Sequence, residues 1–405
     1  MAVRMSIYLD HNATGPVHPE VAAALEPFLA GGYGNPSAPY AAGQEARRAL
    51  QQARAQVAEL LGASPEQVVF TSGGTEANNL AITGAFFGRA ERGRRHLVLS
   101  AIEHPSVAET CAWLASRHGA EVTVVGVGGD GRVEPAEVEA ALRPETLLVT
   151  VMHANNETGV IQPVEAIGRC LQGRGIRFHV DGVQAAGRLA VDTAAIGCQS
   201  YAVSAHKFGG LKGSGALVLR QAVGVDAILH GGHQEHGLRA GTENVPGAVA
   251  LGQAAEVARR DLLANRTHCL RLRARFDALT GRLPRCWRNG HDDLRLPNTT
   301  NLCCLHADAM SVVLALSSLG LYVGTGSACA SQRQEPSRVL AAMGLTPEAA
   351  FCSIRISCGP ENTLDEAVWA ADRIAEVVER VRLVTAPADI GSCGEDCPCH
   401  LEARS

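Results

Sequence analysis

The sequence lacks an excess of basic residues. It contains 36 Lys and Arg against 41 Asp and Glu, which gives a net charge of −5 and a pI near 6.3. Proteins whose main partner is a nucleic acid usually carry a basic overall balance or a basic patch. The composition therefore argues against nucleic acid as the principal partner.

The sequence also lacks a hydrophobic segment at its start and a long apolar run that stays uninterrupted. Residues 1–6 contain no apolar stretch of the kind that forms the core of a signal peptide. Residues 309–332 carry no charge, but small residues break them up, namely Ser317, Ser318, Gly320, Gly324 and Gly326. We therefore expect a buried helix followed by a strand there, and no membrane span.

A disulfide framework is absent as well. The 13 cysteines are odd in number and follow no disulfide-like spacing, so we expect reduced thiols and a cytoplasmic location. Near the end, three cysteines and a histidine fall close together: Cys393, Cys397, Cys399 and His400. They could bind zinc or an iron–sulfur cluster, or they could be free thiols of a tail. Their spacing matches no standard site, so we assign no metal there.

The order of apolar segments predicts an α/β fold. The chain has 405 residues and a mass of 42.4 kDa, which is enough for about two domains. Predicted strands at 68–70, 96–100, 122–127, 147–152 and 176–180 are interspersed with helical segments. This alternation favours a mostly parallel sheet with helices on both faces. A helical region at 243–279 then leads into a smaller α/β unit.

One lysine stands at the end of a predicted buried strand. Residues 201–207 run from apolar side chains to Ser204, His206 and Lys207, and a glycine-rich loop follows. A lysine amine is nucleophilic only when it is deprotonated, which requires desolvation or a cationic neighbour. Such a lysine could hold pyridoxal phosphate (PLP) as a Schiff base, or it could simply be a surface residue that ends a strand.

Two further segments fit a PLP site. Asp181 ends an apolar strand, where open α/β sheets bind ligands, and a PLP enzyme needs a carboxylate at the pyridine nitrogen. Residues 68–79 supply a strand, a glycine turn and a helix start, which is a favourable place for a phosphate. Taken singly, Asp181 could instead be a helix cap and the glycines an ordinary tight turn.

Seven short motifs occur in an order that resembles one known family, the PLP-dependent cysteine desulfurases of aminotransferase class V. They are residues 33–37, 71–76, 103–105, 155–159, 204–207, 239–244 and 326–329. The resemblance extends from residue 8 to residue 357, which is nearly the whole chain apart from the tail. The sequence departs from the usual family pattern at Gly182, Leu211 and His233, where alanine, proline and glycine are common.

The resemblance implies a PLP-dependent transferase of fold type I, with a large, mostly parallel-sheet domain and a smaller α/β C-terminal domain. On this basis we expect four parts. Residues 1–15 are an arm that packs with the small domain, residues 16–260 the PLP domain, residues 261–385 the small domain, and residues 386–405 a cysteine-rich tail.

The resemblance also implies roles for particular residues. Lys207 would bind PLP and move the substrate's protons, and His104 would stack on the ring as an acid or a base. The other expected cofactor-binding residues are Gly74, Thr75, Asn156, Asp181, Gln184, Ser204 and His206. Asn156 and Arg355 would bind the substrate, with Arg355 on its carboxylate. Thr242 would reach the PLP phosphate of the partner subunit, which implies a homodimer.

Cys329 is the implied sulfur acceptor, because it closes the motif at 326–329. The implied reaction converts L-cysteine to L-alanine and leaves a persulfide on Cys329, which could also take part in transfer to a cluster. An acceptor or iron–sulfur scaffold protein would then take the sulfur for iron–sulfur cluster or other thio-cofactor synthesis. Two alternatives stay open: a selenocysteine lyase of the same fold, and a metal-binding carrier that uses the cysteine tail.

Overall fold

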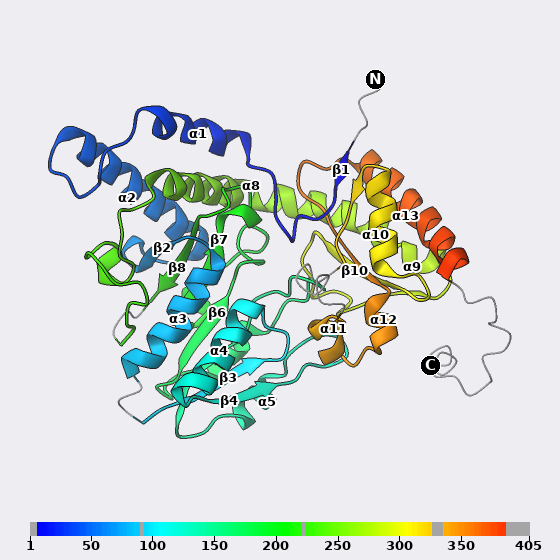
Figure 1. The fold of residues 1–405 in the computed structure, drawn as a ribbon, viewed down its shortest axis with the longest axis horizontal. Helices are drawn as coiled ribbons and strands as arrows, with labels where there is room; N and C mark the ends of the chain where they lie inside the picture. The colour runs from blue at the N-terminus through cyan, green and yellow to red at the C-terminus, as the bar shows by residue number, and fades with distance from the viewer. Residues whose placement is uncertain (1–5, 90–92, 221–223, 326–334, 386–405) are drawn as a thin grey trace.

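A seven-stranded sheet forms the centre of the larger part of the molecule (Figure 1). The computed structural model describes residues 6–89, 93–220, 224–325 and 335–385. The strand order is β2-β8-β7-β6-β5-β3-β4. The bounds are β2 Val68–Thr71, β3 His96–Ser100, β4 Glu121–Val125, β5 Thr146–Thr150, β6 Arg177–Asp181, β7 Ser200–Ser204 and β8 Gly215–Leu219. Every residue of these strands except those of β4 is buried, as expected for a sheet covered on both faces.

The pairing agrees with the predicted, mostly parallel sheet. Strands β4, β3, β5, β6 and β7 are parallel neighbours, while β8 runs antiparallel to both β7 and β2. Strand β8 was not predicted, because it begins inside a glycine-rich loop that has the composition of a turn. Gly215 allows this strand to pass close to the chain beside it, since a Cβ there would lie 2.6 Å from the Cα of Gly73.

Helices cover the two faces of the sheet. On one face α2 (Ala41–Leu61), α6 (Val164–Leu171) and the first half of α8 (Val245–Asp277) pack on the strands. On the other face α3 (Gly74–Arg89) and α4 (Pro105–His118) do so. The remaining helices of this part are α1 Pro19–Ala30, α5 Pro135–Ala140 and α7 Thr193–Ile196. The predicted α/β layering is therefore present.

Helix α8 joins the large part to the smaller one and runs below α1 in Figure 1. Its early residues, such as Leu251, lie in the core of the large sheet, and its later residues Leu272 and Phe276 lie in a second core. That second core also contains a three-stranded sheet, ordered β12-β10-β9. The elements there are α9 Leu279–Arg282, β9 Cys286–Arg288, β10 Thr299–Cys304, α10 Ala309–Ser318, β11 Leu321–Tyr322, α11 Arg338–Ala342, α12 Pro347–Phe351, β12 Ser353–Ser357 and α13 Leu364–Thr385.

The N-terminal arm lies against the smaller part. Strand β1 (Ile7–Tyr8) pairs in parallel with β11, and Asp10 forms a bridge with Ser357 of β12. Ile7 and Leu9 are buried in the second core. The domain boundaries given above remain predictions. The next residues of the arm, 10–15, are hydrogen-bonded to the large part.

The uncharged run at 309–332 begins as expected. Helix α10 is followed directly by β11, and Ala309, Val312, Leu316 and Leu321 point into the second core. Across the described ranges, none of the helices combines the length and the hydrophobicity that a membrane crossing requires.

Gly182, one of the departures from the family pattern, lies against the buried ring of Tyr201. An added Cβ would approach the Cε1 and Cζ atoms of Tyr201 to 1.9 and 2.0 Å, and the Tyr201 hydroxyl is already bonded to His153 Nδ1 at 2.9 Å. We expect Gly182→Ala to lower the free energy of unfolding by about 1–3 kcal/mol, because the ring has no room to move. Denaturant titration measures this change.

Gly126→Ala is the matched control, since an added Cβ there meets no atom within 4 Å. The double variant with Tyr201→Leu should lose less stability than the sum of the single changes, because the smaller side chain makes room. A Gly182→Ala protein as stable as the parent would show that the contact is not restrictive.

Candidate active site

The predicted site residues gather at the carboxyl ends of the parallel strands. Asp181 ends β6, and Lys207 lies in the short 3-10 turn after β7. Gly74 begins α3 directly after the turn that follows β2, the loop after β3 carries His104, and the loop after β5 carries Asn156. Ligands of open α/β sheets bind at this edge, so the topology alone brings these residues to one place.

Lys207 has the properties that a catalytic lysine needs. Its half-buried amine donates to the backbone oxygens of Asn12 at 2.6 Å and Ala13 at 2.7 Å. Burial, and then the charges of Arg188 and Arg355, lower the pKa of Lys207 to about 7, although two nearby carboxylates oppose the shift. A substantial fraction of the amine is therefore neutral at physiological pH.

A chain of hydrogen bonds connects Asp181 with His104. Asp181 Oδ2 accepts from Asn78 Nδ2 at 2.8 Å, and Asp181 Oδ1 accepts from the backbone of Val183 at 3.0 Å. The same Asn78 amide donates to Ser106 Oγ, which lies 2.8 Å from His104 Nδ1. Burial is the main cause that lowers the pKa of His104. These contacts fix the carboxylate and the imidazole relative to each other.

His104 also has an ordinary structural role. Its Nδ1 accepts from the backbone N–H of Ser106 at 3.1 Å, so the residue caps the N-terminus of α4. The cap holds Nδ1 on the helix side, which leaves Nε2 as the atom that can meet a ligand.

The start of α3 forms a cradle without side chains. Gly73 has a φ of 154°, and a Cβ on Gly74 would lie 2.6 Å from Val183 Cγ2. Ser204 lies beside this turn, since a Cβ on Gly73 would come within 3.7 Å of its hydroxyl. Thr75 follows on the helix and is exposed. Free backbone N–H groups at a helix start are suited to a phosphate.

His206 lies next to Lys207 and is held by the N-terminal arm. Its Nδ1 is 3.1 Å from Thr14 Oγ1. Burial and the neighbouring cation Lys207 lower the pKa of His206 to about 4, so its imidazole is neutral at pH 7. A neutral imidazole can donate a hydrogen bond to a phosphate from one of its two nitrogens.

The expected substrate-binding residues also contact the arm. Arg355 donates to the backbone oxygen of Asn156 at 3.0 Å and forms an ion pair with Asp10 at 2.5 Å. Asn12 Nδ2 donates to the same Asn156 oxygen at 3.1 Å. The Arg355 guanidinium and the arm therefore meet at the backbone oxygen of Asn156.

Some predicted residues are not brought into this site. Thr242 is exposed, and it makes no hydrogen bond to any residue in the described part of the chain. Cys329 and the tail residues Cys393, Cys397, Cys399 and His400 lie outside the described residues. Within the described ranges there is no group of three side chains arranged to hold a metal ion.

Four contributors were not predicted: Asp10, Asn12, Asn78 and Arg188. Asn78 joins Asp181 to His104, and Asn12 accepts at its backbone oxygen from both Lys207 and Gln184, the latter at 2.9 Å. Of these four, only Arg188 could have been suspected from a local pattern, because it stands four residues after the predicted site residue Gln184. The other contacts join segments that are far apart in the chain, so no local pattern could reveal them.

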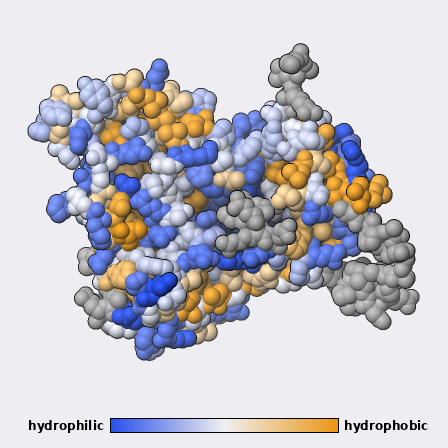
Figure 2. All heavy atoms as spheres, viewed as in Figure 1, coloured by the Kyte–Doolittle hydropathy of each residue, from blue (hydrophilic) through white to orange (hydrophobic). Residues whose placement is uncertain are grey.

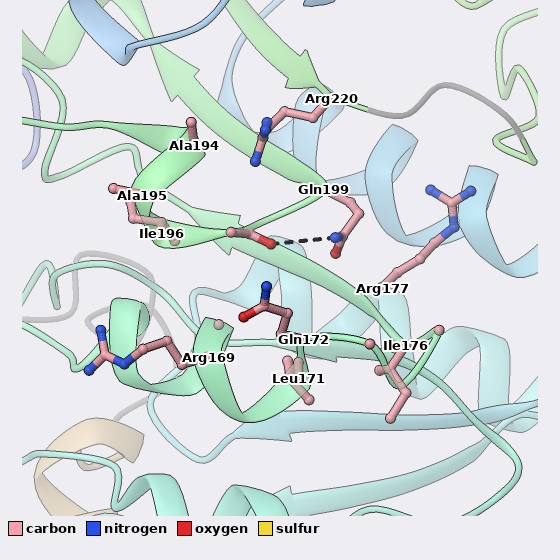
Figure 3. Close-up of a pocket in the computed structure, with 14 residues that line it drawn as sticks. Arg169, Leu171, Gln172, Ile176, Arg177, Ala194, Ala195, Ile196, Gln199 and Arg220 are labelled. Atoms are coloured by element: carbon pink, nitrogen blue, oxygen red, sulfur yellow. Dashed lines mark hydrogen bonds between the residues drawn. The ribbon is translucent and has the colours of Figure 1, made fainter.

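A separate hollow of about 740 Å³ lies at the opposite, amino end of the sheet (Figure 3). Three arginines line it, but Figure 3 shows Arg169 and Arg177 on opposite sides with their guanidinium groups directed away from each other. None of the predicted site residues lines this hollow. It therefore has no part in the candidate active site.

Comparison with known proteins places this site in a family. The aminotransferase class-V family matches residues 7–368. A cysteine desulfurase IscS from Methanosarcina thermophila is 41% identical over 377 residues, which are 93% of this chain and 93% of that protein. A cysteine desulfurase from Trichormus azollae is 42% identical over 380 residues, or 94% of each chain.

Solved structures give the same result. A NifS-like protein superposes with a TM-score of 0.87 at 33% identity and covers 93% of this chain and all (100%) of that chain. A structure of SspA in complex with cysteine has a TM-score of 0.78 at 35% identity, with 89% of this chain and 100% of that chain covered.

The chain therefore belongs to the class V aminotransferases and has their fold type I architecture. Within that class it belongs to the cysteine desulfurases, and it is a PLP-dependent enzyme. The predicted family, fold class and cofactor are confirmed.

The residues at the sheet edge fit PLP. A buried carboxylate, a lysine amine of lowered pKa and a glycine cradle at a helix start are the three features that the ring nitrogen, the aldehyde and the phosphate need. The individual residue roles remain proposals.

Proposed function

We propose that the protein removes sulfur from L-cysteine, releases L-alanine and leaves the sulfur as a persulfide on Cys329. The observation that carries this proposal is the position of Lys207, whose amine of lowered pKa lies at the same sheet edge as the buried carboxylate of Asp181. The substrate is supported by relatives that are named cysteine desulfurases and by a similar structure that holds cysteine.

When bound, PLP supplies a protonated ring that withdraws electrons from the substrate Cα. Asp181 keeps the proton on the pyridine nitrogen, because its carboxylate is buried and held by Asn78. Lys207 would hold the cofactor through its amine, and that amine would take a proton at the substrate Cα and later return one. A pKa near 7 suits both transfers at neutral pH.

Further residues orient the reactants. Gly74, Thr75, Ser204 and His206 would bind the phosphate at the start of α3, and Gln184 would donate to the ring oxygen. Arg355 would bind the substrate carboxylate together with Asn156. The ion pair with Asp10 keeps the guanidinium in place before the substrate arrives.

Cys329 performs the sulfur step. Its thiolate attacks the substrate sulfur, an S–S bond forms, and the Cβ–S bond breaks with its electron pair left on the carbon that becomes the alanine methyl group. The described residues that flank this segment support the assignment. Gly324 pairs with the backbone of Arg355, and Ser337 Oγ donates to Glu157, the residue after Asn156. Both flanks are therefore tied to the expected substrate-binding residues.

The described cysteines are poorer candidates for that step. All nine are free thiols, and seven of them are buried. Burial raises the pKa of Cys111 and Cys198, each to about 12, and disfavours the reactive thiolate. The pKa values of Cys269 and Cys286 are lowered, but each of these thiols is hydrogen-bonded to a second, buried cysteine. The free thiols also support a cytoplasmic location, where cysteines stay reduced. We propose that a thiol or an acceptor protein then takes the sulfur for iron–sulfur cluster or other thio-cofactor synthesis.

The experiment that tests this function compares products from two substrates. Purified protein with PLP should form alanine and a protein persulfide from L-cysteine, at a rate above that with selenocysteine. A strong preference for selenocysteine, with no persulfide, would favour the lyase. A protein that binds metal but no PLP would favour the carrier.

We also propose a homodimer with shared sites, which leads to a testable expectation. Thr242 is exposed, and large apolar side chains are exposed near the corner of α1 and α2, where Leu29 is 73% and Tyr33 89% accessible. Figure 2 shows apolar surface gathered over this corner. If Thr242 binds the partner's cofactor, Lys207→Ala and Thr242→Ala subunits should complement each other when mixed.

In a mixed dimer of these variants, one site carries both defects and the other site carries none. Activity should therefore recover toward half of the parent value per dimer, and light scattering should give twice the chain mass. Mixtures whose activity does not exceed the mean of the two variants, although mixed dimers form, would place Thr242 in its own subunit's site.

A further inference from the structure

Arg188 is a partly buried cation that contacts the site through neutral groups. Its Nη1 donates to the backbone oxygen of Gln184 at 3.0 Å and to the Gln184 side-chain oxygen. Its Nη2 donates to the backbone oxygens of His11 at 3.0 Å and Lys207 at 3.2 Å. Among the residues that the structure describes, no carboxylate lies within salt-bridge distance of it. Within the described ranges, the guanidinium thus has four neutral acceptors and no counter-ion.

Burying the Arg188 charge without an ionic partner lowers the stability of the fold, which suggests that the charge has a role in the site. A desolvated charge without an ionic partner costs on the order of several kcal/mol. Burial lowers the pKa of Arg188 to about 10, so the group nevertheless stays charged at neutral pH. Arg188 and Arg355 balance the two nearby carboxylates, Asp10 and Asp181, so every proton that Lys207 holds adds positive charge to the site. An added proton on Lys207 is therefore disfavoured.

We propose that Arg188 is a positioning residue whose fixed charge keeps the Lys207 amine neutral and whose hydrogen bonds hold Gln184 and the N-terminal arm around it. This inference rests on the proposed function, because it assumes that Lys207 reacts with PLP. The guanidinium joins the arm, the turn after β6 and the turn after β7, which are the segments that carry His11, Gln184 and Lys207.

The other charged groups around Lys207 contribute less than Arg188 to the lowering of its pKa. The titratable and charged groups that face it are Asp10, His104, Asp181, Arg188, His206 and Arg355. Arg355 is also cationic, but its charge is balanced by the ion pair with Asp10. The pKa of His206 is about 4, so its ring adds no charge at pH 7. Arg188 is accordingly the largest charge contribution that lowers the pKa of Lys207.

The hydrogen bonds of Arg188 also fix the Gln184 amide. With the guanidinium on its oxygen, Gln184 must direct its NH2 group away from Arg188, and Nε2 donates to the Asn12 oxygen at 2.9 Å. Lys207 donates to that same Asn12 oxygen at 2.6 Å. The amide donor therefore lies beside the lysine amine, where it could donate to a ring oxygen of PLP.

The test follows the rate at which the full chain, freed of cofactor, takes up PLP at a series of pH values. The visible absorbance of the lysine-bound cofactor reports the reaction, and only the neutral amine reacts. The parent protein should show a midpoint near pH 7, the pKa of Lys207. In Arg188→Gln the midpoint should rise by about one pH unit. In Arg188→Lys, which keeps a positive charge, the midpoint should stay close to the parent value.

Arg273→Gln is the matched control, because that half-buried arginine donates to the Leu296 oxygen and makes no contact with Lys207. Arg188→Met provides a second neutral replacement if Arg188→Gln does not fold. An unchanged midpoint in a folded neutral variant, or equal shifts in Arg188→Lys and Arg188→Gln, would overturn the proposed role of the charge. A parent protein that takes up PLP with this midpoint but makes no alanine would instead contradict the proposed function alone.

Discussion

Replacing Lys207 by alanine is expected to reduce alanine formation from L-cysteine by about three orders of magnitude or more, since a positioned acid–base group alone contributes about 10²–10⁴-fold. The variant loses both the covalent hold on PLP and the amine that moves the Cα proton. Its folded core should persist, because the lysine is only half-buried and its two acceptors are backbone oxygens of the arm.

Two measurements separate this outcome from a loss of folding. The visible absorbance of lysine-bound cofactor should disappear, while the denaturation midpoint should change little. Lys212→Ala is the matched control, because Lys212 is an exposed lysine of the same glycine loop. A Lys207→Ala protein with normal turnover would refute the assignment of the lysine, and equal losses in both variants would point to the loop instead.

The fold was largely predictable because its strands are short apolar runs at regular intervals. The segments now seen as β3, β5 and β6 were predicted within one or two residues at either end. Strand β8 was missed because Gly213 and Gly215 give its start the composition of a turn. Its strand conformation depends on pairing with β2 and β7, which is a tertiary effect.

The site was predictable only as far as its motifs extend. Lys207, Asp181 and His104 stand in short local patterns, and the strand ends bring them together. The arm was expected to pack with the smaller part, yet residues 10–14 also supply hydrogen-bond partners to Lys207, His206 and Arg355. The contact with Lys207 goes to a backbone oxygen, and the other two join side chains that are far apart in the chain, so no local sequence pattern predicts them.

The case of Arg188 shows a different limit. The sequence shows that Arg188 stands four residues after Gln184. Its proposed role, however, depends on contacts with three partners from separate segments, Gln184, His11 and Lys207. From the sequence alone, an arginine in a polar turn is equally consistent with a solvent-exposed or ion-paired side chain. Only the absence of a carboxylate near it, in the described part of the molecule, marks this one as unusual.

The replacement of Cys329 by serine separates desulfuration from the other reactions of PLP enzymes. Lysine, aspartate and a phosphate cradle would serve a transaminase equally well. Serine keeps the size of the side chain but cannot form a persulfide. We expect the variant to bind PLP and cysteine normally and to lose persulfide formation and nearly all alanine production, by about 10³-fold or more if a nucleophile is removed.

The structure supplies two kinds of control for this variant. Cys170 is partly exposed and lies on α6, so Cys170→Ser tests an accessible thiol far from the chemistry. Cys303 is fully buried, with its thiol 3.4 Å from the Ala349 oxygen, and Cys303→Ser tests a buried one. Both should keep the activity, and the parent protein, exposed briefly to cysteine, should show the added sulfur on Cys329 alone by mass spectrometry.

Testing Cys329→Ser with selenocysteine also distinguishes a cysteine desulfurase from a selenocysteine lyase. A free thiol with an ordinary pKa of about 8.5 is only a few per cent ionised at pH 7, so Cys329 must be activated by its surroundings or by the substrate. The C–Se bond is weaker than the C–S bond and depends less on attack by a thiolate. If Cys329→Ser makes alanine from cysteine at the parent rate, the persulfide mechanism is wrong. If it fails on cysteine but keeps its activity on selenocysteine, the lyase becomes the better assignment, because the cysteine would then be needed only for the harder bond.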